Sequence, residues 1–507
     1  MMLKNAGLGQ RKCAGIAAEA LTRGVSTAVN VEKETTQQPG RERNLYKRLS
    51  ALGAKKGLVG ATINEYLREG RVPHKQELMR CIKELRRFGR HHQALETMEW
   101  MDTRNVKLSH RDHATRLDLI CKTQGIDAAE DYFNGLPPSA KNQFTYGALL
   151  NCYCVEKMKD KALDLFDEMH QMQIAPSSLA FNNVMSLYMR LGQPEKVPPL
   201  VDEMKKRKIP LSTFTYNIFM HSYSCLDDIE GVERVFEEIM QEGGKRYDWT
   251  TFSNLAVAYV NAGLNEKAVL ALKKVEQEMG PRNREAFHYL LSLYARTANI
   301  GEVHRIWKSL RSSLPTVTNL SYLTLLQALN KLNDVHGLQN CFQEWESTCS
   351  SYDIRLANLA IGAYLRHDMA EDAESVFHSA LKRSSGPFFV AREMLMMYYL
   401  KNRNIRLALQ CMEAAISELD GSEWQPKSDS ICKFLTVCEE EKDVDSAEEF
   451  CKYLKKVNCL NHRGYKSLLQ TYVAAAKTAP YMRTRIEGDG IEICSELENL
   501  LQNVSPE

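Results

Sequence analysis

The sequence predicts an all-α fold, a right-handed α-solenoid of about eleven or twelve tandem helical hairpins. Two observations predict it: a tyrosine that recurs at a fixed spacing, and a helical hydrophobic pattern inside each repeat. A fixed period of about 20 to 50 residues indicates a repeat array. Successive tyrosine steps are 35, 35, 36, 35, 70 and 35 residues. The tyrosines are Tyr153, Tyr188, Tyr223, Tyr259, Tyr294, Tyr364 and Tyr399, with Leu329 at the missing step.

The hydrophobic pattern within one repeat is that of two helices. In residues 181–188 the apolar side chains fall on one face of a helix with 3.6 residues per turn. Gly192 and Pro194 then mark a turn, and residues 197–204 form a second amphipathic segment. A hairpin with one apolar side cannot bury it alone, so neighbouring repeats must stack.

The N-terminal residues predict a targeting segment. Residues 1–30 contain Lys and Arg, many small residues and a single acid, Glu19, which is typical of an organellar transit peptide. Arg and Lys outnumber Ser and Thr there, which favours the mitochondrial matrix over a plastid. We expect cleavage somewhere after Arg23.

The rest of the chain follows the repeat period. We predict a linker and N-terminal capping helices in residues 31–74, with helices near 45–52 and 59–69. The repeat array is predicted over residues 75–475, and a degenerate C-terminal cap, with a final helix over 491–501, over residues 476–507. Residues 419–424 stretch one repeat as a surface insertion. The repeats are expected to start near residues 75, 110, 143, 178, 213, 249, 284, 319, 354, 389, 428 and 462.

The charge distribution and the cysteine content exclude few classes of function. The net charge is +2, but residues 1–125 have a clear excess of Lys and Arg, while the remainder is net acidic. That asymmetry suggests contact with an acidic polymer, or simply a targeting peptide and a solvated helix face. The 14 cysteines include no C-x-x-C pair and fit a reducing compartment. No apolar run is long enough for a transmembrane helix, so no membrane insertion is expected.

The repeats resemble pentatricopeptide repeats (PPR). Residues 143–177 and 178–212 share an aromatic residue at the fourth position, a tyrosine at the eleventh and Glu-Met near the twenty-sixth. Their ends, Ile174 to Pro176 and Ile209-Pro210, distinguish them from tetratricopeptide repeats. Uniform repeats near 35 residues resemble the P class of plant organellar PPR proteins.

The resemblance implies RNA binding with one base per repeat. In that family the fifth and last residues of a repeat read the base edge, and the second residue wedges the base. Three consecutive repeats carry suitable residues and would together read about C-U-A. Their base-reading residues are Asn182 with Ser212, Asn217 with Asp248, and Ser253 with Asn283, and their wedge residues are Leu179, Phe214 and Thr250.

The other repeats depart from this pattern. Met79, Ala114, Gly147 and Leu323 hold fifth positions but cannot read a base edge by side-chain hydrogen bonds. Glu393 would repel a nearby phosphate. An alternative for Asn182 and Asn217 themselves is that they only help their helices to start.

Basic side chains crowd the first repeat. Such cations could contact phosphate, or they could form a solvated outer face. These candidates are Arg80, Lys83, Arg86, Arg87 and Arg90. His110 and His113 lack further ligands for a metal. We therefore predict no metal site, no cofactor and no catalytic residue.

The leading hypothesis is a non-catalytic, RNA-binding solenoid in mitochondrial RNA processing, stability or translation. Its partner would be RNA, either a single-stranded transcript or ribosomal RNA. The first alternative is a scaffold in a ribonucleoprotein such as the mitochondrial ribosome, with ribosomal proteins as further partners. The second alternative is a solenoid that binds proteins only.

Overall fold

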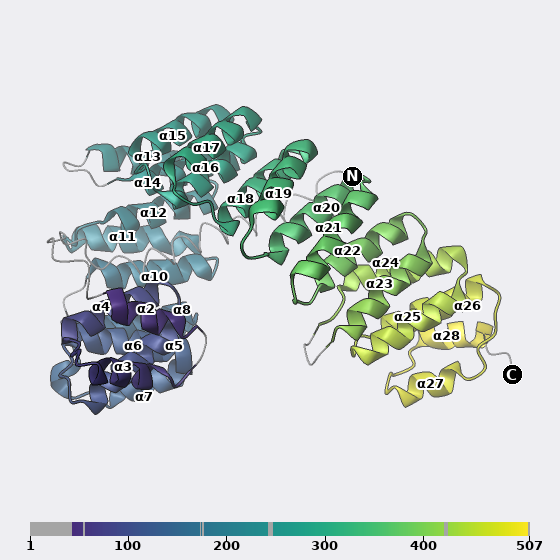
Figure 1. The fold of residues 1–507 in the computed structure, drawn as a ribbon, viewed down its shortest axis with the longest axis horizontal. Coiled ribbons are helices and arrows are strands. Elements are labelled where there is room, and N and C mark those ends of the chain that lie inside the picture. The colour runs from purple at the N-terminus through teal and green to yellow at the C-terminus, as the bar shows by residue number, and fades with distance from the viewer. Residues whose placement is uncertain are drawn as a thin grey trace. The chain divides into compact units, whose positions relative to one another are not determined.

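The computed structural model describes residues 43–53, 56–172, 174, 177–241, 247–419 and 424–504. Every α-helix and 3₁₀ helix assigned lies in these residues, and they contain no strand, which confirms the all-α prediction (Figure 1). The predicted transit peptide (residues 1–30) lies outside the described residues. Most of the insertion at 419–424 does too.

The chain divides into two compact parts, residues 1–278 and 279–507, and each is described by itself. The N-terminal part contains α2 (Arg43–Ala51), α3 (Val59–Arg68), α4 (Lys75–Arg87), α5 (His91–Thr103), α6 (His110–Gln124), α7 (Ile126–Asn134), η1 (Pro138–Ala140), α8 (Gln143–Val155), α9 (Lys159–Gln171), α10 (Ser178–Arg190), η2 (Pro194–Lys196), α11 (Val197–Lys206), α12 (Thr213–Cys225), α13 (Ile229–Gln241), α14 (Trp249–Asn261) and α15 (Asn265–Glu278). The C-terminal part contains α16 (Arg284–Arg296), α17 (Ile300–Ser313), α18 (Asn319–Lys331), α19 (Val335–Thr348), α20 (Ile354–Arg366), α21 (Ala370–Arg383), α22 (Phe389–Lys401), α23 (Ile405–Ser417), α24 (Ser428–Glu441), α25 (Val444–Lys456), α26 (His462–Ala474), α27 (Met482–Gly488) and α28 (Ser495–Val504).

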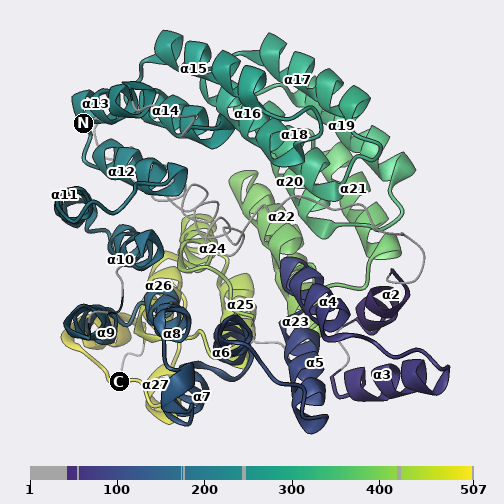
Figure 2. The ribbon, with the colours of Figure 1, turned by 90° about the vertical axis from the view of Figure 1, so that its left-hand side faces the viewer.

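The predicted repeats are helical hairpins. Even-numbered helices from α4 to α26, which we term first helices, begin at the residues predicted as repeat starts. Odd-numbered helices from α5 to α25, the second helices, complete the hairpins. Within each part, a first helix packs against the first helices of neighbouring repeats, as α10, α12 and α14 do in Figure 2. First and second helices therefore form two layers.

The periodic tyrosines join these layers. Tyr294 and Tyr364 are fully buried, and Leu329 takes the same place in the core at the missing step. Two of the less buried tyrosines, Tyr259 and Tyr399, donate their hydroxyl proton to a glutamate on the second helix of the preceding repeat. Tyr259 bonds Glu233 in this way at 3.0 Å. The period thus records a contact between neighbouring repeats.

The turn inside each hairpin contains a residue with a left-handed backbone conformation. One residue after each first helix from α8 to α24 has positive φ, which glycine adopts freely and other residues adopt at a cost. These residues are Lys157, Gly192, Asp227, Gly263, Ala298, Asn333, Asp368, Arg403 and Lys442.

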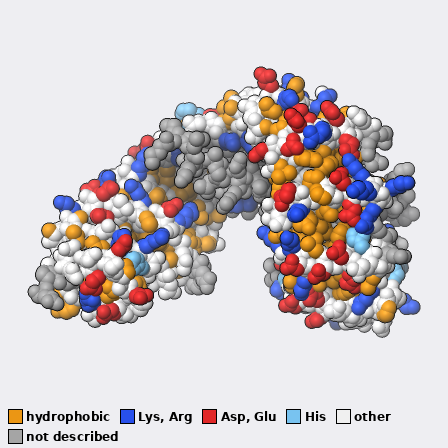
Figure 3. All heavy atoms as spheres, turned by 180° about the vertical axis from the view of Figure 1, so that it is seen from behind, with side chains coloured by type: hydrophobic (Ala, Val, Ile, Leu, Met, Phe, Trp, Pro, Cys, Tyr) orange, Lys and Arg blue, Asp and Glu red, His pale blue; other side chains and the backbone are white. Residues whose placement is uncertain are grey.

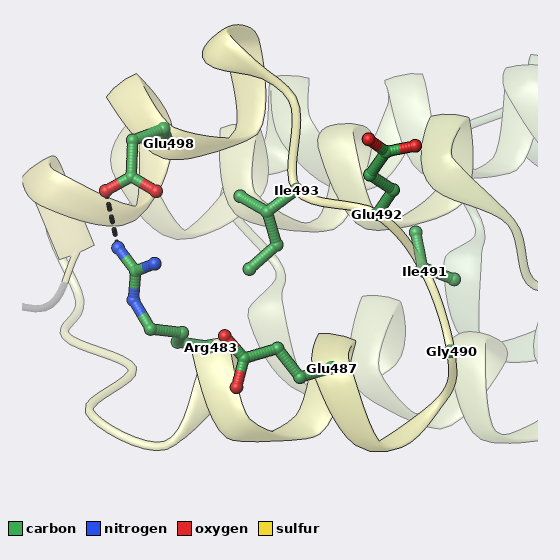
Figure 4. A pocket seen from close by; sticks show the side chains of 7 residues that line it. All are labelled: Arg483, Glu487, Gly490, Ile491, Glu492, Ile493 and Glu498. Atoms are coloured by element: carbon green, nitrogen blue, oxygen red, sulfur yellow. Dashed lines mark hydrogen bonds and ion pairs between the residues drawn. The ribbon is translucent and has the colours of Figure 1, made fainter.

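Both ends of the described chain are helical, with one correction. The helices expected near residues 45–52 and 59–69 are α2 and α3, and their capping role stays a prediction. At the C-terminus the sequence pattern was expected to decay after residue 480, but α27 forms there, and α28 begins at Ser495 rather than at residue 491. Leu497, Leu501 and Val504 of α28 are buried, so this helix continues the core of the C-terminal part. Arg483 donates to Glu498 across the open hollow between α27 and α28 (Figure 4).

Candidate nucleic-acid interface

The last residues of the candidate repeats are the N-caps of the next first helices. Ser212 Oγ accepts the Thr215 N–H at 3.1 Å, and Asp248 Oδ1 accepts the Thr250 N–H at 2.8 Å. Asn283 Oδ1 caps α16 in the same way. Ser, Asp and Asn satisfy the free N–H groups of a helix start. The predicted base-reading residues at this position therefore also have a structural role.

The fifth residues lie in the first turns of α10, α12 and α14 and are nearly buried. The exposed fractions of Asn182, Asn217 and Ser253 are 5%, 4% and 3%. A buried polar group is costly unless it has a hydrogen-bond partner, so their partners decide what they can offer to a ligand.

The structure brings the candidates of repeat 213–248 together. Asn217 Nδ2 donates to Thr250 Oγ1 at 2.7 Å, and Thr250 Oγ1 donates to Asp248 Oδ1 at 2.5 Å. Asn217 Oδ1 is buried without a partner. The predicted fifth and last residues of this repeat and the wedge residue of the next repeat thus form one bonded chain that ends in an unused acceptor.

Repeat 178–212 has a similar chain with a different bridge. Thr215 Oγ1 donates to Asn182 Oδ1 at 2.9 Å and lies 2.9 Å from Ser212 Oγ. The prediction did not include Thr215. The sequence signal that could have identified Thr215 is a hydroxyl residue at the third position of the next repeat.

The third candidate pair is less well organised. Ser253 Oγ donates to the Trp249 carbonyl oxygen of its own helix at 2.9 Å, a local bond common for serine in helices. Ser253 lies in the N-terminal part and Asn283 in the C-terminal part, so their joint role stays a prediction.

Apolar side chains are exposed at the wedge position. The side chain of Leu179 is 43% exposed and that of Phe214 is half-buried. Three further apolar residues at the second position of their repeats are also exposed, and the same register would have identified them. They are Phe144, Leu320 and Val390.

The predicted phosphate-contacting residues lie on α4 and just after it, and acidic neighbours partly neutralise their positive charges. Arg86 pairs with Asp118 at 2.8 Å, and Arg87 lies 3.8 Å from Glu84. Burial would raise the pKa of Asp118, but Lys122 and Arg86 outweigh it and lower that pKa below its ordinary value. Arg90 is the N-cap residue, immediately before the first residue of α5. Lys83 is exposed, and Arg80 also has an interaction within the chain.

Glu393 corrects an expectation. Its side chain is 8% exposed, and Oε1 accepts the Ser430 hydroxyl at 2.6 Å and the Lys427 N–H at 2.9 Å. The carboxylate is therefore engaged inside the protein rather than facing a ligand.

First and second helices differ in charge. The first helices α8, α10, α12, α14, α18 and α20 contain no Asp or Glu, whereas the second helices α7, α9 and α13 have acids in excess. The face drawn in Figure 3 shows side chains of both charges interspersed with hydrophobic side chains.

A cation lies in the last turn of seven first helices, a recurrence that the sequence analysis did not predict. These cations are Arg87, Lys122, Arg190, Arg296, Lys331, Arg366 and Lys401.

The described residues contain no group of three His, Cys, Asp or Glu placed to hold a metal ion. None of their helices combines the length and apolar character needed to cross a membrane.

Sequence comparison relates the chain to known repeat proteins. The profile described as PPR repeat matches residues 144–174, 214–244 and 357–384, and that of the PPR repeat family matches residues 176–225. The pentatricopeptide repeat-containing protein At4g01990, mitochondrial, of Arabidopsis thaliana is 44% identical over 507 residues, which cover 100% of both chains. A second Arabidopsis thaliana relative, At1g02370, mitochondrial, is also 44% identical, over 92% of this chain and 87% of its own.

A third relative and a solved structure extend the comparison. The large ribosomal subunit protein mL101 (rPPR4) of Arabidopsis thaliana is 38% identical over 95% of this chain and 99% of its own. The crystal structure of the pentatricopeptide repeat protein PPR10 from maize matches with a TM-score of 0.60 at 16% identity, over 96% of this chain and 69% of that chain. At this identity the structural match supports the fold alone.

Proposed function

The chain belongs to the pentatricopeptide repeat family, and on that premise we propose that it is a non-catalytic, RNA-binding α-solenoid of plant mitochondria. It acts in RNA processing, stability or translation by covering or remodelling RNA. Two relatives that are 44% identical are named mitochondrial. We place the protein in the matrix, because its proposed ligand is organellar RNA.

One observation carries the proposal: seven of the twelve first helices contain no Asp or Glu, and seven have a cation in their last turn. Because adjacent first helices pack side by side within each part, residues at equivalent positions recur along one layer. Lys331, Arg366 and Lys401 are exposed at such positions. Phosphate contacts by Lys and Arg supply much of the affinity for nucleic acid. The same cations also favour the negative end of the helix dipole, so the two roles are compatible.

Base contacts come from nearly buried amides on two of these first helices, α10 and α12. Asn182 and Asn217 have the hydrogen-bonding groups to pair with a base edge, and Leu179 and Phe214 present apolar surface against which a base packs. Few repeats carry such residues. We therefore infer limited sequence selectivity, with the backbone supplying most of the binding energy.

Binding of fluorescent RNA to the full-length protein tests this function. We expect single-stranded RNA containing C-U-A to bind with an affinity that falls as salt rises. A duplex of the same sequence is expected to bind more weakly, because its base edges are already paired. Salt-independent binding, or none, would contradict RNA binding and favour a solenoid that binds only proteins.

A second function, a structural component of the mitochondrial ribosome, is favoured by one specific observation. The relative named large ribosomal subunit protein mL101 is 38% identical over nearly the whole of both chains. A ribosomal scaffold would co-sediment with a ribosomal subunit from mitochondrial extract. That association should survive Asn182→Ala and Asn217→Ala and fail after charge reversal at Arg86 and Arg87. A transcript-binding protein would instead sediment with RNA outside the ribosome.

A further inference from the structure

A hydroxyl in the first turn of a first helix links the fifth and last residues of the preceding repeat. In the N-terminal part Thr215 lies between Asn182 and Ser212, and Thr250 lies between Asn217 and Asp248. In the C-terminal part Ser321 is the third residue of its first helix, as Thr215 is, whereas Thr250 is the second residue of α14. Ser321 Oγ lies 2.9 Å from His288 Nε2 and 3.1 Å from Thr318 Oγ1. The arrangement therefore recurs in both parts.

The residue at the last position limits which way the bridging hydroxyl can donate. A carboxylate accepts hydrogen bonds and has no proton to donate. Thr250 must therefore give its single proton to Asp248 and can only accept from Asn217. The Asn217 amide then points its NH₂ group at Thr250, and its Oδ1 atom is left without a partner.

A hydroxyl at the last position removes this limit. Ser212 can donate to Thr215, so Thr215 is free to donate to Asn182 Oδ1. The amide then uses its oxygen inside the protein, and its NH₂ group remains to serve a ligand. Two asparagines at the same register position are therefore held in opposite orientations.

We propose that Thr250 and Thr215 are positioning residues that set the amide orientation of Asn217 and Asn182, so that Asn217 offers an acceptor and Asn182 a donor to RNA bases. The inference rests on the proposed RNA-binding function. Uracil carries a proton on N3, whereas the cytosine N3 is an acceptor. The Asn217 site then prefers uracil, and the Asn182 site prefers cytosine. The last residue acts on the amide through the hydroxyl of the next repeat.

Competition between three RNAs tests the relay in the full-length protein. The RNAs share all flanking nucleotides and contain C-U-A, C-C-A or U-U-A. We expect Thr250→Val, which removes the hydroxyl and keeps the shape, to reduce the preference for C-U-A over C-C-A from on the order of tenfold to about twofold or less. Thr250→Val should leave the preference for C-U-A over U-U-A unchanged. Thr215→Val should have the converse effect.

Conservative variants separate positioning from folding. Thr250→Ser and Thr215→Ser retain the hydroxyl and should retain both preferences, with thermal melting followed for every variant. An unchanged preference in Thr250→Val and Thr215→Val, or an equal loss of both preferences in each, would overturn the relay while RNA binding stands. Failure of the unaltered protein to bind any of the three RNAs would overturn the proposed function and the relay with it.

Discussion

Asn217 in the N-terminal part and Glu393 in the C-terminal part occupy the same fifth position of their repeats, and both are nearly buried. Each bonds to a hydroxyl in the first turn of the next first helix, Thr250 or Ser430. Asn217 keeps one carbonyl oxygen unbonded, whereas Glu393 Oε1 also accepts the Lys427 N–H. One register position can therefore either leave a group for a ligand or fasten the next repeat.

The residue that precedes the next helix explains the difference. Asp248 caps α14 with its own carboxylate, so Asn217 is not needed as a hydrogen-bond acceptor at the start of that helix. Lys427 precedes α24 and has no acceptor in its side chain. Glu393 reaches over from the neighbouring first helix and accepts the Lys427 N–H. At α14, by contrast, Thr251 Oγ1 accepts the equivalent Asp248 N–H. Stability and binding should thus respond differently to substitutions at the two positions.

The largest effect is expected for Glu393→Ala. It leaves the Lys427 N–H and the Ser430 hydroxyl without their buried partner and should reduce the free energy of unfolding by about 3 kcal/mol, since bonds to charged groups are strong. Glu393→Gln keeps an acceptor and should lose clearly less. Denaturant unfolding measures both. Equal stability of Glu393→Ala and the unaltered protein would remove the structural side of the comparison.

Asn217→Ala should instead impair binding. We expect a loss of about 2 kcal/mol on RNA containing C-U-A, the usual value of a specific base contact, measured by fluorescence anisotropy. RNA in which C replaces the U serves as the control and should lose little. The same loss on both RNAs would show that Asn217 does not distinguish bases.

Loss of a helix cap is expected to have a smaller effect on the free energy of unfolding. Asp248→Ala removes the acceptor for the Thr250 N–H at the start of α14 and should lower the free energy of unfolding by about 1 kcal/mol. His74→Ala is the matched control, because His74 precedes the first helix α4 and makes no side-chain cap bond. Thermal or denaturant unfolding measures the stability of both variants. An equal loss of stability in the two would contradict this account.

The pH response of the C-terminal part depends on His288. Burial, and then the charge of Arg284, lower the pKa of His288 to about 4. An unfolded histidine has a pKa of about 6.5, so between these values the unfolded chain binds more protons and stability falls as the pH is lowered. His288→Asn should reduce the loss of melting temperature between pH 7 and pH 5. We expect a modest change, because solvent screens a half-buried group, and an identical pH response in the variant would rule out this role for His288.

The smallest effect concerns the turns. Gly263 in the N-terminal part and Ala298 in the C-terminal part both have positive φ, 75° and 56°. Ala298→Gly should raise the free energy of unfolding by about 0.5 kcal/mol, because glycine relieves the left-handed strain but loses more entropy on folding. Gly263→Ala should lower it. Urea unfolding measures both, and a change of the same sign in the two variants would contradict the assignment.

The sequence was sufficient to predict the helices because several residues in every repeat serve the same contact. Tyr259 bonds the preceding repeat and Gly263 adopts the positive φ of the turn, and the tyrosine and the turn both recur with the period. The start of every first helix followed from that register. The C-terminal helices α27 and α28 follow no period, so their limits were not predicted correctly.

The candidate site was only partly predictable. The residue types at 182, 217, 212 and 248 suggested base contacts, but not which atoms the protein itself uses. That depends on Thr215 and Thr250, which lie in the next repeat and bridge by single hydrogen bonds. Glu393 shows the same limit, since a carboxylate expected to repel phosphate is bonded internally.

The salt dependence of RNA binding tests the central claim that the row of first helices binds RNA. One variant replaces Lys331, Arg366 and Lys401 with Gln, and a matched variant replaces the exposed second-helix residues Lys206, Lys273 and Lys308. Each phosphate contact contributes about 0.7 to the slope of log affinity against log salt for single strands. We predict that the first variant loses about 2 from this slope and the second loses almost nothing. Equal slopes in the two variants would contradict the account.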